Sequence, residues 1–149
     1  MSVLAKNKEA FFNYVIEHEL EAGIVLLGHE VKSVKTGTMS LKGAHVTIRG
    51  NEAVLVNAHI SPYKYSGEIP GYDPTRSRKL LLNRKEISSL IGKYKEQGMA
   101  VVPLEVYTKH GLVKLKLGIG RGKKKYDKRE SIKKRDDKRK MARVLKSSR

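Results

Sequence analysis

Residues 99–119 read MAVVPLEVYTKHGLVKLKLGI and predict two β-strands, Met99–Thr108 and Leu112–Ile119, joined by a turn at residues 109–111. In the second strand every other residue is apolar, and the residues between them are Lys114, Lys116 and Gly118. Successive side chains of a strand point to opposite faces. One face of this hairpin is therefore expected to pack into a core, and the other is expected to be basic.

Further strands are predicted upstream of this hairpin. The segment Phe11–Leu27 alternates as a half-buried antiparallel strand does, with an interruption at Glu21-Ala22-Gly23 that fits either a bulge or a bend. The segments Ala44–Arg49 and Ala53–Ile60 flank Gly50-Asn51 and predict a hairpin. Strands so predominate that the body is expected to be mainly β.

Two short helices are expected between the strands. In Gly28–Gly37 the valines are spaced by three, and the final glycine suits a helix end. In Asn83–Gly98 apolar residues recur at helical spacing, and Asn83 and Glu86 have the spacing of a capping box. The intervening segment Ser61–Thr75, rich in proline, glycine and tyrosine, predicts a long irregular loop.

These elements predict an oligonucleotide-binding-like antiparallel β-barrel with embedded helices over residues 1–120, and a basic C-terminal tail over residues 121–149. Gly118–Lys123 lacks the spacing of a phosphate-binding P-loop and is interpreted as a flexible exit from the barrel, with backbone amides that can meet a phosphate. Fold class alone does not identify a function.

The charge of the chain is concentrated in the tail. Residues 121–149 hold 15 of the 32 lysines and arginines but four of the 15 acidic residues of a chain with net charge +17. The tail contains few apolar residues, and burying them cannot offset the entropy lost on ordering the segment. We therefore expect the tail to be disordered when free. Asp127 and Glu130 again have capping-box spacing, which favours a helix formed on a phosphate-lined surface over a solvated polyelectrolyte.

The composition narrows the possible functions. With a pI of about 10.1, nucleic acid is the first candidate partner and an anionic membrane surface the second. No membrane span and no export signal are expected, and the absence of cysteine fits the cytoplasm. The five scattered histidines predict no metal site, and no motif for a catalytic nucleophile or a cofactor is found. The chain is therefore not expected to be an enzyme or to need a cofactor.

The sequence also resembles a known family, the SsrA-binding proteins, which are the partners of transfer-messenger RNA. The resemblance covers residues 7–149 and rests on five segments in order. These segments are Glu21-Ala22-Gly23, GHEVKS at 28–33, NAHISPY at 57–63, DPTRSRKLLLN at 73–83 and GKKKYDKR at 122–129.

The resemblance implies a non-catalytic RNA-binding protein. Its body would bind the tRNA-like domain of transfer-messenger RNA, one copy per RNA. Its tail would then enter the decoding centre and the empty mRNA path of a stalled ribosome, where it would contact rRNA. This would support trans-translation, in which the unfinished peptide is tagged and the ribosome is rescued. A ribosomal-type protein with a basic extension and an RNA-modifying or hydrolytic enzyme remain alternatives.

Candidate site residues follow from both lines of reasoning. The resemblance implies RNA binding by Glu21, Leu81 and Asn83. Because Asn83 is also a predicted helix N-cap, the helix start is expected to face the RNA. An apolar residue such as Leu81 just before a helix is most often core, and would then act indirectly. A carboxylate repels phosphate, so Glu21 is expected to accept hydrogen bonds from a base edge, a 2′-OH or a basic side chain.

The remaining candidates are basic residues and tail residues. Basic residues supply phosphate affinity, and the resemblance implies work in the ribosome for residues 126–129 and 143–146. The basic candidates are Lys32, Lys114, Lys116, Arg121, Lys123, Lys124 and Lys125; the tail candidates are Tyr126, Asp127, Lys128, Arg129, Arg143, Val144, Leu145 and Lys146.

Overall fold

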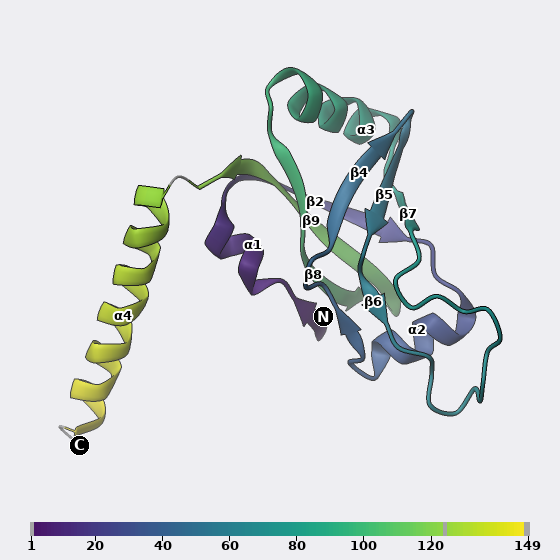
Figure 1. Cartoon of the computed structure of the whole chain (residues 1–149), viewed down its shortest axis with the longest axis horizontal. Coiled ribbons are helices and arrows are strands. Elements are labelled where there is room, and N and C mark those ends of the chain that lie inside the picture. Colours follow the sequence, from purple (N-terminus) through teal and green to yellow (C-terminus); the bar gives the residue numbers. More distant parts are fainter. Residues whose placement is uncertain (1, 124, 148–149) are drawn as a thin grey trace.

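The computed structural model describes residues 2–123 and 125–147, in which an antiparallel sheet carries small helices at its ends and a separate C-terminal helix (Figure 1). The sheet has seven strands in the order β1-β8-β9-β2-β7-β5-β4, and β3 and β6 form a second, two-stranded sheet. The strands are β1 (Ser2–Lys6), β2 (Tyr14–Ile24), β3 (Met39–Ser40), β4 (His45–Arg49), β5 (Glu52–Val56), β6 (His59–Ile60), β7 (Arg78–Leu81), β8 (Ala100–Lys109) and β9 (Leu112–Gly122).

The helices occupy the connections and the end of the chain. None of them, within the described ranges, has the length and apolar character needed to cross a membrane. They are α1 (Lys8–Asn13), α2 (Gly28–Lys35), α3 (Arg84–Ile91), the π-helical turn η1 (Gly92–Glu96) and α4 (Lys125–Ser147).

The long hairpin predicted from residues 99–119 forms two neighbouring strands of the sheet, between β1 and β2. β8 and β9 pair from Ala100 opposite Gly120 to Lys109 opposite Leu112. Leu115 and Leu117 of β9 are fully buried, while Lys114 and Lys116 lie on the other face. The β4–β5 hairpin, the short helix α2 and the capped helix α3 are likewise confirmed.

The predicted β-barrel is not closed in the described part of the chain. Strand pairing ends at β1 on one side and β4 on the other, with no pairing between these two strands in the described part of the chain. The sheet is nevertheless strongly curved, because β4 comes into contact with β8 across the core. Curvature rather than closure thus encloses the apolar interior.

Two local predictions near the N-terminus are wrong. The predicted strand from Phe11 instead begins at Tyr14, because residues 8–13 form α1, capped by the Asn7 side chain, which accepts a hydrogen bond from the Ala10 amide at 3.3 Å. Nor does β2 break at Glu21-Ala22-Gly23. The strand continues to Ile24, and its register shift lies between Ile16 and His18.

The glycines near the end of β9 are also not a flexible exit. Gly118 and Gly120 are buried strand residues, and β9 continues through Gly122. A Cβ atom on Gly120 would lie 1.9 Å from the carbonyl oxygen of Val15. Glycine is therefore required there so that the backbones of β2 and β9 can approach closely.

Candidate nucleic-acid interface

The outer face formed by β2, β9 and β8 is a mixed ladder of acids and bases. Lys116 of β9 lies 3.1 Å from the Glu105 carboxylate and 4.0 Å from that of Glu19, and Arg121 lies 2.7 Å from Glu17. The hydrogen bond to Glu105 raises the pKa of Lys116 and keeps its ammonium group charged. The predicted basic face of β9 is therefore found, but the glutamates of β2 and Glu105 of β8 compensate part of its charge.

Glu21 lies on this face and stays ionised. The buried Tyr107 hydroxyl donates a hydrogen bond to Glu21 Oε2, and Lys109 Nζ lies 3.5 Å from the same oxygen. The bond from Tyr107 lowers the pKa of Glu21; desolvation opposes this shift and Lys109 adds to it. Burial, and then the bond to Glu21, raise the pKa of Tyr107. The proton thus stays on Tyr107, and within the described structure Oε1 of Glu21 has no hydrogen-bond donor of its own.

Leu81 is not a core residue. Its side chain is 54% exposed, and it packs against Gly23, where an added Cβ would lie 3.1 Å from the Cβ of Leu81. Strand pairing places Gly23 between Leu81 of β7 and Lys114 of β9. A groove of about 220 Å³ runs along this junction. It is lined by Gly23, Ile24, Leu26, Val31, Leu81, Gly111, Leu112, Val113 and Lys114.

Asn83 follows Leu81 and begins α3 as predicted. Its Oδ1 accepts the Glu86 amide at 2.8 Å, and the Glu86 carboxylate accepts the Asn83 amide at 3.0 Å. Asn83 is exposed, and Arg84 and Lys85 follow it. The cap uses the side-chain oxygen Oδ1 of Asn83, which leaves the side-chain nitrogen Nδ2 as a donor for a ligand.

The structure therefore brings some predicted site residues together and separates others. Leu81 of β7 and Lys114 of β9 flank Gly23, Glu21 lies two positions before Gly23 on β2, and Asn83 lies two positions beyond Leu81. Arg121 instead lies opposite Val15, near the other end of β2. Lys32 projects from α2, where its Nζ lies 5.9 Å from the centre of the Tyr63 ring.

The tail candidates lie at and beyond the end of β9. The Lys123 amide donates to the Asn13 carbonyl at 2.7 Å, and the exposed Arg129 and Arg143 belong to α4. Lys124 lies outside the described residues. The following residues belong to α4, but their side chains lie outside what the structure describes: Lys125, Tyr126, Asp127, Lys128, Val144, Leu145 and Lys146.

A buried ionic network behind the groove was not predicted from the sequence. The Glu30 carboxylate of α2 accepts hydrogen bonds from Arg78 at 2.6 and 3.0 Å, from Tyr72 at 2.9 Å and from Arg76. The side chains of Glu30 and Arg78 are 0% exposed. Arg78 also donates to the Ala58 and Pro74 carbonyls, at 2.8 and 2.9 Å. The network therefore fixes α2, β7 and both ends of the loop 61–75 to one another.

One sequence signal could have revealed this network. Arg78 occupies a position in β7 whose alternate neighbour Leu80 is core, so its side chain had to point inward. An inward arginine needs a buried acid. That acid is Glu30, the third residue of α2, whose carboxylate also accepts a hydrogen bond from the Leu27 amide at 2.8 Å.

This network makes stability sensitive to acid. Burial raises the pKa of Glu30, but the bonds from Arg76, Leu27, Arg78 and Tyr72 outweigh it and lower the pKa from 4.5 to about 2. Because its pKa is lower in the folded state than in the unfolded state, the Glu30 carboxylate stabilises the fold fully at pH values above the unfolded-state pKa. This contribution is lost as the pH falls from about 4.5 towards 2. The loss is on the order of 3 kcal/mol.

Urea unfolding between pH 7 and pH 2.5 tests this expectation. Glu30→Gln does not titrate, so the difference in unfolding free energy between it and the natural chain should shrink as the pH falls. Glu52→Gln removes the carboxylate of an exposed pair, 3.1 Å from Lys79, and is the matched control with a small difference at every pH. A difference for Glu30→Gln that stays constant with pH would contradict the assignment.

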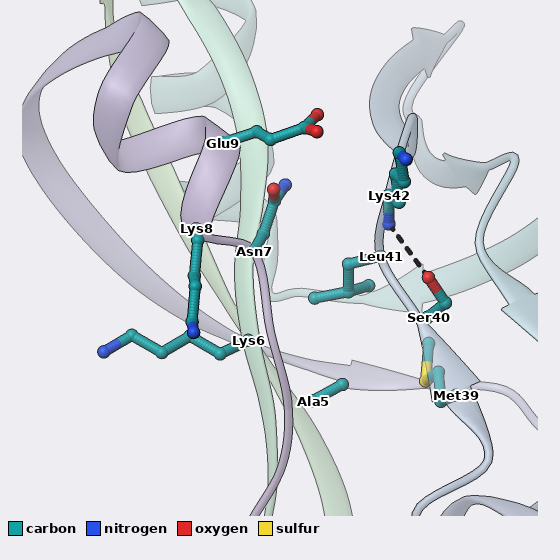
Figure 2. Close-up of a pocket in the computed structure, with 9 residues that line it drawn as sticks. All are labelled: Ala5, Lys6, Asn7, Lys8, Glu9, Met39, Ser40, Leu41 and Lys42. Carbon is teal, nitrogen blue, oxygen red and sulfur yellow. Dashed lines mark hydrogen bonds between the residues drawn. The ribbon is translucent and has the colours of Figure 1, made fainter.

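A different pocket lies beside the N-terminus. Figure 2 shows the segments 5–9 and 39–42 facing one another across a cavity of about 260 Å³, with Lys6, Lys8 and Lys42 among its lining residues. The Ser40 hydroxyl accepts the Lys42 amide at 3.3 Å on one side of it. None of the predicted RNA-binding residues whose side chains the structure describes lines this pocket. In the ranges 2–123 and 125–147 no cluster of histidine and acidic side chains suits a metal ion.

Comparisons with known proteins match most of the length of this chain. The family model described as "SmpB protein" matches residues 4–147. The SsrA-binding proteins of Acetivibrio thermocellus and Trichodesmium erythraeum are 51% and 49% identical to the chain, over 98% and 97% of its length and 94% and 92% of theirs. A chain in the solved structure "tmRNA-SmpB: a journey to the center of the bacterial ribosome" is 38% identical with a TM-score of 0.67, over 85% of this chain and 92% of that one. The chain belongs to the SmpB family of SsrA-binding proteins.

Proposed function

We propose that this protein binds the tRNA-like domain of transfer-messenger RNA and delivers it to stalled ribosomes, where it supports trans-translation without catalysing a reaction. Membership of the SsrA-binding family supports this function, as does the likeness to a chain solved with transfer-messenger RNA in a ribosome context. The protein acts in the cytoplasm, as one copy per RNA. The curved sheet serves as a partly open barrel of the oligonucleotide-binding kind.

The observation that carries the binding role is the junction of β2, β7 and β9. There Glu21, an ionised carboxylate with an unused oxygen, lies two positions before Gly23, which the exposed Leu81 and Lys114 flank. Lys114 forms no salt bridge among the described residues, although its charge interacts with that of Glu21. Glu21 can accept from a base amino group or a 2′-OH, while Lys114 attracts phosphate. Leu81 offers an apolar surface to a base or sugar. Such a mixed site suits a folded RNA better than a bare polyanion.

The tail has a separate task in the proposal. Arg121 and Gly122 end β9; beyond them the tail forms a helix that is stable only in the decoding site and empty mRNA path of the ribosome. The basic side chains supply contacts to rRNA, and binding supplies the free energy that orders the segment.

The RNA that co-purifies with the full chain tests the function. Sequencing it should return one small RNA with a tRNA-like end as the dominant species. Recovery of the rRNA of one ribosomal subunit at fixed stoichiometry would instead favour a permanent ribosomal protein. Glu21→Ala and Asn83→Ala should reduce recovery of the small RNA, whereas Glu9→Ala, an exposed residue of α1 beside the separate N-terminal pocket, should not.

A further inference from the structure

The loop 61–75 presents two tyrosine rings next to one another on the surface. The rings of Tyr63 and Tyr65 meet edge to face, with their centres 5.5 Å apart and their planes at 68°. Lys32 Nζ lies 5.9 Å from the Tyr63 ring, and Lys64 Nζ lies 5.5 Å from the Tyr65 ring. These four residues, Tyr63, Tyr65, Lys32 and Lys64, are called the tyrosine platform below.

The folded chain gives Tyr65 no structural task. Its side chain is 77% exposed and packs against neither core cluster. In the described structure its hydroxyl has no hydrogen-bond partner, and Lys32 and Lys64 make no ion pair with a carboxylate, the nearby Glu68 included. A large aromatic ring with uncompensated cations beside it is a surface that a ligand can use.

The platform is held on a fixed loop. The Ser66 amide donates to the Tyr63 carbonyl at 3.0 Å, which closes a turn around Lys64 and Tyr65. The Ser33 hydroxyl donates to the Ser61 carbonyl at 2.5 Å, so the start of the loop is tied to α2, which carries Lys32. The buried Glu30 network holds the other end of the loop. Little ordering is left for a ligand to supply.

We propose that the tyrosine platform binds an unpaired RNA base, which stacks on Tyr65 while Lys32 and Lys64 contact the flanking phosphates. Exposed aromatic rings interleaved with cations are the general device for binding single-stranded nucleic acid. Helix α2 connects the platform with the groove described above, because Val31, which precedes Lys32 on α2, lines that groove together with Leu81. The inference rests on the proposed function and adds a stacking site for an unpaired nucleotide of the same RNA.

A single tryptophan can report the stacking directly. The chain contains no tryptophan, so Tyr65→Trp in the full-length protein gives a lone reporter that can still stack. Its fluorescence should be quenched by single-stranded oligo(A) or oligo(U) of about 12 nucleotides, a length within the usual site sizes. Tyr94→Trp should not be quenched, because Tyr94 lies in η1 directly after α3, which is at the opposite end of the sheet from α2 (Figure 1). Equal quenching of Tyr65→Trp and Tyr94→Trp would overturn the proposal. So would the absence of quenching in Tyr65→Trp at an oligonucleotide concentration at which fluorescence anisotropy of the oligonucleotide shows saturated binding.

Affinity measurements separate the ring from its hydroxyl. Tyr65→Ala should weaken binding of the oligonucleotide about tenfold, the loss of one stacked base, whereas Tyr65→Phe should bind within about twofold of the natural chain. Lys32→Ala or Lys64→Ala should each lower the salt dependence of binding by about one phosphate contact. If Tyr65→Ala binds like the control Tyr94→Ala, or Tyr65→Phe is as weak as Tyr65→Ala, the site does not work by stacking.

The outcome also separates this inference from the proposed function. Should the natural chain recover its tRNA-like RNA while Tyr65→Ala binds normally, the platform is wrong and the proposed function stands. Should oligonucleotides quench Tyr65→Trp while no tRNA-like RNA co-purifies, the platform stands and the proposed function is wrong. Quenching by a ribosomal protein but not by RNA would assign the platform to a protein partner and overturn the inference.

Discussion

Gly120→Ala is expected to lower the free energy of unfolding by about 4 kcal/mol or more, which for a small domain removes most of the stability. The new Cβ would lie 1.9 Å from the Val15 carbonyl oxygen and 3.0 Å from the Cα of Ile16, so backbone meets backbone and no rotamer change can relieve the clash. Either β2 or β9 has to shift. Urea or thermal unfolding of the purified variant measures the effect.

Two neighbouring glycines provide matched controls. At Gly122 an added Cβ has no atom within 4 Å, so Gly122→Ala should change stability by about 0.5 kcal/mol or less. At Gly118 it would lie 2.9 Å from the Leu104 side chain, which can move, and an intermediate loss is expected. Equal stability of the Gly120 and Gly122 variants would show that β2 and β9 are not packed as described.

This close approach matters for RNA binding because β2 and β9 build the candidate site together. Glu21 and Gly23 come from β2, and Lys114 and Lys116 come from β9 in register with them. A shift of β9 along β2 would separate the Glu21 carboxylate from Lys114. The partial variant Gly118→Ala should therefore weaken RNA binding only to the extent that it destabilises the sheet.

Local patterns in the sequence were sufficient to predict most of the elements. The alternation in residues 112–119 identified β9, and the spacing of Asn83 and Glu86 identified the start of α3, because both signals depend on residues close together in the chain. The prediction of a strand from Phe11 was wrong because the alternation of the segment was considered without the residues before it. The polar side chain of Asn7, which caps α1, lay outside the pattern being read.

Contacts between distant residues could not be predicted. Glu30 and Arg78 are far apart in sequence, and neither local segment indicates that the other contains its ion-pair partner. Gly120 looked like part of a mobile exit because its neighbour Val15, brought close by strand pairing, is not visible in the sequence. Leu81 was expected in the core, since hydrophobicity alone does not show that its side of β7 faces solvent beside Gly23.

The same limit applies to the candidate site. The resemblance supplied Glu21, Leu81 and Asn83, and charge supplied the lysines, but only the fold shows which of them meet. It places Lys116 between two glutamates and Arg121 against Glu17, so these cations are partly compensated. Lys114 and Lys32 form no salt bridge within the described residues, although the charge of Lys114 interacts with that of Glu21, and they are the stronger candidates for contacts with phosphate.

The division of work between body and tail is the central claim, and the structure makes it separable. The buried core ends with Ile119 of β9, while α4 meets the body where Arg135 lies near Phe12 of α1. Residues 1–123 should therefore fold without the tail, and their thermal unfolding should match that of the full chain. Equal stability is the control that makes a functional comparison valid.

The most direct measurement compares residues 1–123 with the full chain for binding to the tRNA-like RNA and for peptide tagging on stalled ribosomes. The account predicts that the shortened protein keeps much of its specific RNA binding and loses tagging altogether, because the body binds the RNA and the tail acts inside the ribosome. Loss of all specific RNA binding by the folded body, or tagging that persists without the tail, would contradict it.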